Sequence, residues 1–543
     1  MTGLAAVGGA FGLPAPAAET SFPAGPRIVD VKTHGAVGDG KTLDGRAINR
    51  AIEICHASGG GVVYLPPGVY LSGTVVLKSN VTLYIEGGAT LLGSKELADY
   101  KGSHLPVDAR HKHLIFARDA ENVGIAGPGH IDGQGPAFWF PTERTVPPNQ
   151  AWRDGATHYW KGLSDRPTPL LEFYKCKNLR IKDVTIVNAP GWTLRPIQCE
   201  YVFIRGIVIK NPNIGPNTDG IDITCSQNVF ISDCLIDTGD DAICLKSEPA
   251  YGTGVPLLKN VTVTNCMLTT CCNAFKIGTG THGGFENITF SNSLIVNPES
   301  DLKARAIAGI ALEMVDGGWL EGVTISNIRM QRVRTPIFIR RGNRTGEKAG
   351  TLRGIMINNV HATGAAVTSS IAGIPGFDVE DVSLSNIRID SEEDGKEDWV
   401  NREIPEVQKN YPEARMFGRL PSHGFYCRHV KGLRMTGIEF TSSPSEARPA
   451  LICDDVKGFT LDGLRSSSLS GSQPMIKLRQ TQEAFLRGCA APPDTKTFLA
   501  VEGRQSSQIV LLGNNLTAAE EVLRTGDEVA KDAVTLAGNV MRH

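Results

Sequence analysis

The sequence repeats one short phrase along most of its length, and this repeat constrains the fold more than any other feature. Each copy alternates apolar and polar residues around a central Asn, Asp or Gly, as in NLRIKDVTIVN from Asn178 and NVFISDCLID from Asn228. Between residues 178 and 381 successive copies begin 23 to 35 residues apart. Alternation with a period of two indicates strands, and short strands at a recurring interval indicate a repeat architecture.

An interval of this size, with two or three strands and Gly or Asn turns per unit, predicts one coil of a parallel β-helix. A single coil cannot bury its inward face alone, so neighbouring coils stack into a continuous core. Propeller blades would need longer, more uniform units with hairpin turns, and helical repeats would show a period of 3.6. We therefore expect an all-β chain with a single β-helix domain over residues 27–543.

Residues 44–57 (DGRAINRAIEICHA) are the exception to the strand pattern. Their apolar residues at 48, 52 and 55 have the spacing of an amphipathic helix. A short helix here would cap the first coil and cover its exposed strand edges. The irregular stretches 136–170, 248–258, 297–306 and 390–428 are expected to project as loops. An aromatic-rich set in the first of them either walls a cleft or packs within the loop: Trp152, Arg153, His158, Tyr159 and Trp160.

Composition excludes several classes of partner. The chain has 55 Lys and Arg against 57 Asp and Glu, a balance that supports neither a nucleic-acid partner nor electrostatic membrane attachment. Its apolar runs are shorter than the roughly 20 residues of a membrane span. The 12 cysteines lack paired metal-ligand spacing, so we expect no metal site. Several cysteines lie in apolar runs as buried thiols, and the adjacent Cys271 and Cys272 are either stacked thiols or disulfide partners.

Residues 1–26 read as a leader rather than as part of the β-helix. Leu4–Leu13 is small and apolar, and the Pro14–Ala18 segment (PAPAA) resembles a small-residue cleavage site. The positive region that opens an export signal is missing, so a disordered leader is the alternative. The interpretation as the remnant of an export signal predicts a periplasmic or secreted protein.

Two acidic segments stand out from the repeats, GPNTDGIDIT from Gly215 and DTGDDAICLK from Asp237. Asp219 and Asp240 are 21 residues apart, about one short coil, so they should stand on adjacent rungs roughly 5 Å apart. Asp241 would join them. A lone Asp would more simply fill a turn, but three convergent carboxylates suit glycosidic hydrolysis. One, with its pKa raised by like charges, protonates the leaving oxygen, while the others deprotonate water.

The NTD at 217–219 and the GDD at 239–241 resemble the central motifs of glycoside hydrolase family 28, the polygalacturonases and their pectin-degrading relatives. The GAVGDGKTLD segment near residue 35 is similar to the entry of pectate-lyase-like β-helices. The resemblance runs from about residue 27 to past 340. It implies a right-handed parallel β-helix and an inverting mechanism without a cofactor. It also implies Asp240 as general acid, Asp219 and Asp241 as activators of water, and Asn217 as a hydrogen-bonding residue that orients one of them.

The chain departs from the family pattern at the residues that bind galacturonate. Asn273 stands where the family has a His, and Ala311 and Glu313 occupy the positions of its basic pair. A Glu facing a substrate carboxylate is repulsive, so the pattern argues against plain endo-polygalacturonase activity. Lys276 is expected to supply a cation instead. His282 either replaces the lost imidazole or is an exposed loop residue.

Aligning the strands of neighbouring coils predicts further contacts. Glu313 should lie beside Arg340, either as a structural cross-strand pair or as a polar subsite for sugar. Arg195 should stack near Asp222. Trp192 is either a sugar platform or a core residue.

The leading hypothesis is an inverting glycoside hydrolase that cleaves pectin-like or other uronate-containing polysaccharides or oligosaccharides. The insertions favour a closed pocket and exo action. A β-helix lyase or epimerase is an alternative, and it would need a base and a cation such as Ca²⁺, which the GDD cluster could ligate. A non-catalytic carbohydrate-binding β-helix is a third hypothesis, but clustering like charges is costly unless chemistry uses them.

Overall fold

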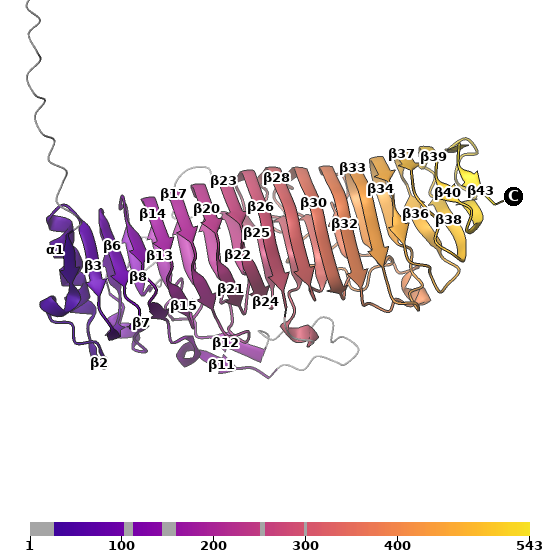
Figure 1. The fold of residues 1–543 in the computed structure, drawn as a ribbon. Coiled ribbons are helices and arrows are strands. Elements are labelled where there is room, and N and C mark those ends of the chain that lie inside the picture. The colour runs from indigo at the N-terminus through magenta and orange to yellow at the C-terminus, as the bar shows by residue number, and fades with distance from the viewer. Residues whose placement is uncertain (1–26, 102–111, 144–158, 250–255, 298–300, 543) are drawn as a thin grey trace, which may run out of the picture.

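The computed structural model describes residues 27–101, 112–143, 159–249, 256–297 and 301–542, and it is a long parallel β-helix. Its coils stack along one axis from the N-terminal helix to the C-terminal strands (Figure 1). One sheet of 39 strands runs through the described residues, and its pairings are parallel. The predicted fold class is confirmed.

Each coil contributes strands to three faces. The first face contains β5 (Val75–Leu77), β8 (Ile115–Arg118), β13 (Leu171–Tyr174), β16 (Leu194–Ile197), β19 (Ile221–Thr224), β22 (Ile243–Ser247), β25 (Asn273–Thr281), β27 (Ala308–Met314), β29 (Thr335–Arg341), β31 (Ser369–Ala372), β36 (Pro474–Arg479), β38 (Thr495–Glu502) and β41 (Ala519–Thr525). The second face contains β1 (Ile28–Asp30), β3 (Gly61–Leu65), β6 (Val81–Ile85), β9 (Gly124–Ala126), β14 (Lys177–Lys182), β17 (Glu200–Arg205), β20 (Gln227–Ser232), β23 (Leu257–Thr264), β37 (Gln482–Arg487), β39 (Ser507–Leu512) and β42 (Val534–Ala537).

The third face contains β2 (Asp39–Leu43), β4 (Gly68–Ser72), β7 (Ala89–Gly93), β10 (His130–Asp132), β15 (Thr185–Val187), β18 (Val208–Lys210), β21 (Leu235–Thr238), β24 (Met267–Thr270) and β35 (Arg465–Ser466). In the C-terminal half, single long strands bend from one face to the next: β26 (Gly284–Val296), β28 (Trp319–Gln331), β30 (Thr351–Ala365), β32 (Val379–Ser391), β33 (Phe425–Thr441) and β34 (Leu451–Asp462). Two small sheets stand apart, β11 (Trp139–Pro141) with β12 (Trp160–Gly162) and β40 (Asn515–Leu516) with β43 (Val540–Met541).

The core follows from the alternation in the sequence. In β20 the side chains of Val229 and Ile231 are fully buried, whereas Phe230 between them faces solvent. Val229 stacks on Val202 of the preceding coil and on Val261 of the next. Repetition of this stacking along the axis builds a continuous apolar column, which is the burial that one coil alone cannot achieve.

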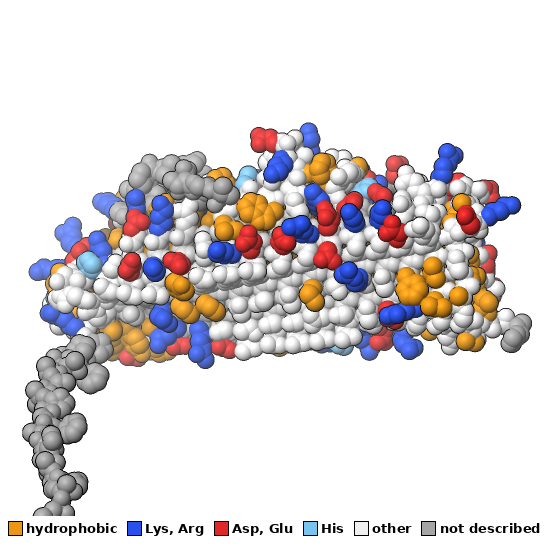
Figure 2. Space-filling model, turned by 90° about the horizontal axis from the view of Figure 1, so that it is seen from above, with side chains coloured by type: hydrophobic (Ala, Val, Ile, Leu, Met, Phe, Trp, Pro, Cys, Tyr) orange, Lys and Arg blue, Asp and Glu red, His pale blue; other side chains and the backbone are white. Residues whose placement is uncertain are grey.

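The Asn at the start of many repeats forms ladders at the turn into the second face. Asn260 adopts a left-handed backbone conformation (φ 56°), donates to Asn228 at 2.9 Å and accepts from Asn287 at 3.1 Å. Asn tolerates this conformation better than most residues. Each Asn therefore fits the left-handed turn and hydrogen-bonds to the Asn of the neighbouring coils, which is why the repeat begins with Asn. Figure 2 shows charged side chains of both signs scattered along the molecule, in keeping with its near-neutral balance.

The predicted capping helix is α1 (Gly45–Ala57), and Ile48, Ile52 and Cys55 are fully buried on its inner side. The preceding Gly-rich segment contains the strand β2, which pairs with β4. All 12 cysteines are free thiols, including Cys271 and Cys272. In the described part of the chain, no helix is long and apolar enough to cross a membrane. The predicted leader, residues 1–26, lies outside the described residues.

Candidate active site

The structure brings the three predicted catalytic carboxylates together at the turns that enter the first face. Asp219 precedes β19, and Asp240 and Asp241 precede β22 on the next coil. The backbone N–H of Gly220 donates to the carbonyl oxygen of Asp241 at 2.8 Å, so the two turns occupy adjacent rungs. Asp219 and Asp241 are buried, whereas Asp240 is partly exposed. The sequence therefore predicted the position of this cluster.

The loop that carries Asp219 is fixed by its own residues. The Thr218 hydroxyl donates to the carbonyl of Gly215 at 2.9 Å and accepts from the N–H of Gly239 at 3.2 Å. The side chain of Asn211 donates to the carbonyl of Thr218 at 3.2 Å. The NTD loop and the GDD loop are thus tied to each other, which holds the carboxylates in a fixed relation.

Asp241 receives donors on both of its oxygens. Asn273, on the following coil, donates its side-chain amide to Oδ1 at 2.7 Å and its backbone N–H to the same oxygen at 3.1 Å. The Lys276 ammonium donates to Oδ2 at 3.0 Å. Burial by itself would raise the pKa of Asp241, but Lys276, Lys246 and Asn273 together hold it below its usual value.

The other two acids are shifted in the opposite direction. Burial, and then the charge of Asp241, raises the pKa of Asp240. Burial, followed by the charges of Asp240, Asp222 and Asp241, raises the pKa of Asp219 well above its usual value. The cluster therefore contains carboxyl groups with raised pKa values beside one with a lowered pKa, and such a separation is what a pair of acid and base needs.

Lys276 links Asp241 to residues further along the helix axis. Its side chain is 2% exposed, and its ammonium lies 3.6 Å from Glu313 and 3.3 Å from the Tyr411 hydroxyl. Burial raises the pKa of Glu313 to about 7, although Lys276 opposes this shift. Lys276 was expected to grip the substrate; its observed contacts instead neutralise Asp241 and Glu313.

The predicted register of Glu313 and Arg340 is confirmed, since the two residues are paired between β27 and β29. No ion pair joins them in the described part of the chain, and the expected counter-ion role is taken by Lys276. Arg340 is 1% exposed and donates to the carbonyls of Gly373 and Glu406, at 2.8 and 2.7 Å. The 390–428 insertion covers its guanidinium, so the structure does not support the expected contact of Arg340 with sugar.

A second buried charge pair lies on the N-terminal side of the acids. The β16–β19 register places Arg195 beside Asp222, as predicted, and Arg195 forms an ion pair with Glu172 at 3.6 Å. Lys246 lies 3.8 Å from Asp222, and burial raises the pKa of Asp222 to about 7 although Lys246 lowers it. The partly buried Trp192 ring lies 4.9 Å from the Lys246 ammonium and 5.4 Å from the Arg195 guanidinium. Its role as a sugar platform stays a prediction.

Two predicted site residues, Asn217 and His282, make none of these contacts. Asn217 is exposed, adopts a left-handed conformation (φ 54°), and has no side-chain hydrogen bond to a carboxylate among the described residues. Asn217 is therefore a turn residue in this structure, and its predicted orienting role stays a prediction. His282 is exposed in the turn after β25, without a described hydrogen-bond partner. Its substrate role also stays a prediction.

Two insertions reach the acids from opposite ends. In the 136–170 insertion, Trp139 donates its indole N–H to the carbonyl of Pro190 at 2.9 Å and lies close to Gly215 of the NTD loop. Tyr159 of the same insertion lies 3.3 Å from the Lys303 ammonium. Of the predicted aromatic set, Trp152, Arg153 and His158 lie outside the described residues. On the other side, the 390–428 insertion carries Tyr411, whose side chain is 55% exposed.

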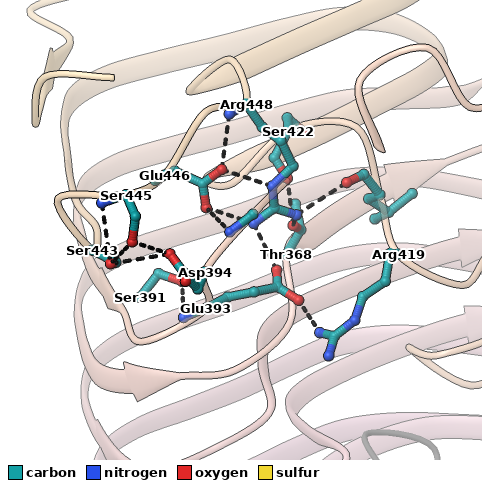
Figure 3. Close-up of polar contacts among 12 residues, drawn as sticks. Thr368, Ser391, Glu393, Asp394, Arg419, Ser422, Ser443, Ser445, Glu446 and Arg448 are labelled. Atoms are coloured by element: carbon teal, nitrogen blue, oxygen red, sulfur yellow. Dashed lines mark hydrogen bonds and ion pairs between the residues drawn. The ribbon is translucent and has the colours of Figure 1, made fainter. Parts of the chain in front are cut away.

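The 390–428 insertion is anchored by a buried ionic cluster, shown in Figure 3. Arg448, fully buried before β34, donates to Glu446 and Glu393, both at 2.8 Å. Glu393 also pairs with Arg419. Because Glu393 and Arg419 belong to the insertion and Arg448 to a later coil, the cluster fixes the insertion that holds Tyr411 beside Lys276.

The acids do not form a good cation site. Ligand atoms of Asp240, Asp241 and Cys272 lie within 4.8 Å of one another. However, one Asp241 oxygen is occupied by the Lys276 ammonium and the other by Asn273, and a thiol is a poor ligand for Ca²⁺. This geometry weighs against the cation-dependent lyase alternative.

The sequence reasoning missed Lys246, Cys272 and Tyr411 as site residues. Lys246 ends the DTGDDAICLK segment, and the β-strand register places it opposite Thr224, two residues after Asp222. That register is a signal that could have identified it. Tyr411 is 135 residues from Lys276 in an irregular stretch, and no periodicity marks it.

Comparison with known proteins agrees with the fold and the acidic motifs. The sequence profile of the glycosyl hydrolases family 28 matches residues 55–408, more than half of the chain. A probable polygalacturonase of Vitis vinifera is 27% identical over 378 residues, covering 65% of this chain and 72% of the relative. An exopolygalacturonase of Arabidopsis thaliana is 27% identical over 383 residues, covering 67% and 80%.

A solved structure extends the comparison. The hyperthermoactive exopolygalacturonase of Thermotoga maritima superposes with a TM-score of 0.54 at 25% identity, covering 68% of this chain and 89% of that protein. The chain belongs to the glycosyl hydrolases of family 28, and it is a glycoside hydrolase similar to polygalacturonases.

Proposed function

We propose that the chain is an inverting, exo-acting hydrolase of uronate-containing polysaccharides or oligosaccharides. One observation carries the assignment of roles: the pKa of Asp240 is raised while that of its neighbour Asp241 is lowered. Asp240, the partly exposed member, is the general acid. A single catalytic domain over residues 27–543 is part of this proposal, and it is supported by the one sheet that includes strands from β1 to β42.

In the proposed reaction Asp240 transfers its proton to the glycosidic oxygen as the bond to the anomeric carbon breaks. A water molecule attacks that carbon from the opposite face, and Asp241 accepts the proton that the water loses. Oδ2 of Asp241 has a further lone-pair site beyond the one used by Lys276, whereas Oδ1 accepts both donors of Asn273. Asp219, with its raised pKa, hydrogen-bonds the same water.

The proposed substrate is acidic because cations and an aromatic ring lie beside the acids. Lys246 and Arg195 flank the ring of Trp192, which offers an apolar face to a sugar ring. Among the described residues Lys246 forms an ion pair with Asp222, whose pKa of about 7 leaves it partly neutral near pH 7. The Lys246 ammonium can therefore pair with a substrate carboxylate in place of Asp222. The names of the relatives, polygalacturonase and exopolygalacturonase, agree with this class.

Exo action is proposed because chain segments stand at both ends of the acidic cluster. Trp139 lies against the loop of Asp219, and Tyr411 contacts Lys276 beyond Asp241. A site with chain segments at both ends admits a chain end more readily than a chain interior. We further propose a periplasmic or secreted location, since a polymeric substrate has to be met outside the cytoplasm; cell fractionation tests it.

The test is hydrolysis of galacturonate and rhamnogalacturonan oligomers by the purified protein. We expect new reducing ends, release of monomer or dimer from the first time points, and an inverted first anomer by NMR. Asp240→Asn should reduce the rate by about 10²–10⁴-fold, the usual contribution of general acid catalysis. Asp237→Asn, on the adjacent β21, is the matched control and should keep the rate within a few fold. Unsaturated, ultraviolet-absorbing products would establish a lyase, and binding without any product would establish a carbohydrate-binding protein.

A further inference from the structure

The second face carries two adjoining depressions that lie away from the acidic cluster. One, of about 460 Å³, is floored by Gly124 and Ala126 of β9 and bordered by Tyr84 of β6. The other, of about 500 Å³, lies over β14, β17 and β20 and is bordered by Phe203 and Phe230. Arg180 and Lys182 of β14 line both, so the two depressions form one surface that crosses six coils, from β3 to β20. We call this surface the β14 trough.

The trough carries unbalanced positive charge. Arg180 and Lys182 are exposed, and neither has a carboxylate partner within 4.0 Å among the described residues. Arg205, 76% exposed, also lines the trough and pairs with Asp233 at 3.1 Å. Asp183 is the one acidic residue among the lining residues of the two depressions. The surface therefore has the potential to attract an anion, although the whole chain is nearly neutral.

Aromatic rings stand beside these cations on the solvent side of the sheet. Phe203 and Phe230 are stacked with centroids 5.2 Å apart and planes 8° apart, and Phe230 is 45% exposed. The Arg180 guanidinium lies 4.5 Å from the centre of the Phe203 ring. The alternation of the strands directs these rings outward, where they gain little from burial, so a solvent-facing pair next to unpaired cations indicates a binding role.

We propose that the β14 trough binds an acidic polysaccharide chain without cleaving it. Phenylalanine faces match the apolar faces of sugar rings, and Arg180, Lys182 and Arg205 match carboxylates on successive sugars. The rungs are about 4.8 Å apart, so one polymer can meet the cations of β14 and then Arg205 of β17 in turn. The inference rests on the proposed function for the identity of the polymer as a uronate polysaccharide.

The consequence is a tether for polymeric substrate. The trough lies on the second face, whereas the catalytic acids lie at turns that enter the first face. A chain held at the trough raises the effective concentration of its ends near the acids. Oligomers too short to reach both places gain nothing, so the trough should affect polymer and oligomer differently.

The experiment measures binding separately from cleavage. The Asp240→Asn protein, with and without Arg180→Ser/Lys182→Ser, is run by affinity electrophoresis in gels that contain polygalacturonate. A Phe230→Ser variant tests the ring. Lys431→Ser/Arg434→Ser is the matched control, because it removes two exposed cations from β33 on the same face. Hydrolysis of a trimer by the same substitutions in the active protein reports on the catalytic site.

We expect Arg180→Ser/Lys182→Ser to weaken binding about tenfold, which corresponds to about 1.4 kcal/mol, and Phe230→Ser to weaken it severalfold. Trimer hydrolysis should stay within twofold of the unsubstituted protein. Unchanged polymer binding, or an equal loss in the β33 control, would overturn the proposal that the β14 trough binds the polymer. Tighter retention by single-stranded DNA than by polygalacturonate would overturn the polysaccharide assignment, since basic and aromatic surfaces also bind that polymer. Trough-dependent binding without hydrolysis of any uronate oligomer would contradict the proposed function alone.

Discussion

Replacement of Lys276 by methionine removes the charge that balances two buried carboxylates. The Lys276 ammonium lies 3.0 Å from Asp241 and 3.6 Å from Glu313, and the three side chains are almost fully buried. Methionine keeps most of the volume, so packing changes little. The substitution therefore isolates the electrostatic contribution of Lys276 to stability and to the ionisation of Asp241.

The loss of stability caused by Lys276→Met depends on pH. In the native protein the depressed pKa of Asp241 stabilises the fold above about pH 3.8, its ordinary value, and this contribution disappears as pH falls through the folded pKa. Without Lys276, burial dominates and the pKa values of Asp241 and Glu313 rise. Each carboxyl then destabilises the fold as pH increases. Breaking a buried pair in this way costs about 3–5 kcal/mol at pH 8. The cost should be small near pH 4, where both carboxyls are protonated.

The assay is thermal unfolding at one scan rate at pH 4, 6 and 8, because a protein of this size often unfolds irreversibly. We expect the deficit of Lys276→Met to grow with pH and Lys276→Met/Glu313→Gln to recover part of it. The matched control is Lys78→Met, which breaks an exposed pair with Glu53 and should change stability by less than about 1 kcal/mol. A deficit that is equal at all three pH values, or larger at pH 4, would refute the electrostatic reasoning.

Three further predictions follow from the same kind of argument. The rate of hydrolysis should fall as pH rises through the raised pKa of Asp240, and Lys276→Met should move the acid limb of the profile upward by about 1–3 units, as measured with a soluble oligomer; an unmoved limb would argue against Asp241 as base. Arg448→Met should lower the melting temperature, since it leaves Glu446 buried without its cation and Glu393 with Arg419 alone, and speed proteolysis within residues 390–428; the exposed Arg434→Met should do neither. Asn260→Ala should cost about 1–3 kcal/mol by chemical denaturation, because the alanine has to adopt φ 56° and leaves two amides unpaired, whereas Asn260→Gly should cost less.

The fold was accessible from the sequence because a solenoid uses only local and nearest-neighbour rules. The alternation around Val229 and Ile231 fixes what is buried, and the Asn at the start of each repeat fixes the turn. Adding the interval between two repeats to a residue's number gives the residue that stacks on it in the next coil. The same periodicity gave the register of Arg195 with Asp222 and of Glu313 with Arg340. No long-range information was needed for these predictions.

The ion-pair partners of the charged residues were harder to predict from the sequence. Strand register gives the positions of the backbones but not those of the side-chain ends. Glu313 and Arg340 are neighbours as predicted, yet Glu313 pairs with Lys276, one coil earlier. The reason is the 390–428 insertion, which offers Arg340 the carbonyls of Glu406 and Val407 and the ring of Phe417. An irregular stretch carries no period, so neither its path nor the position of Tyr411 could be predicted.

The departures from the family pattern form one coupled set. The sequence showed three separate departures. Asn273 replaces the family's His, Lys276 adds a cation, and Glu313 places an acid where it would repel a substrate carboxylate. In the structure Asn273 and Lys276 both donate to Asp241, and Lys276 also balances Glu313. Glu313 without Lys276 would be an uncompensated buried acid, and so would Asp241, since Lys276 is the cation that contacts both. The set therefore keeps the pKa of Asp241 low through the protein's own residues, and it leaves recognition of the proposed acidic substrate to other cations, such as Lys246 beside the ring of Trp192.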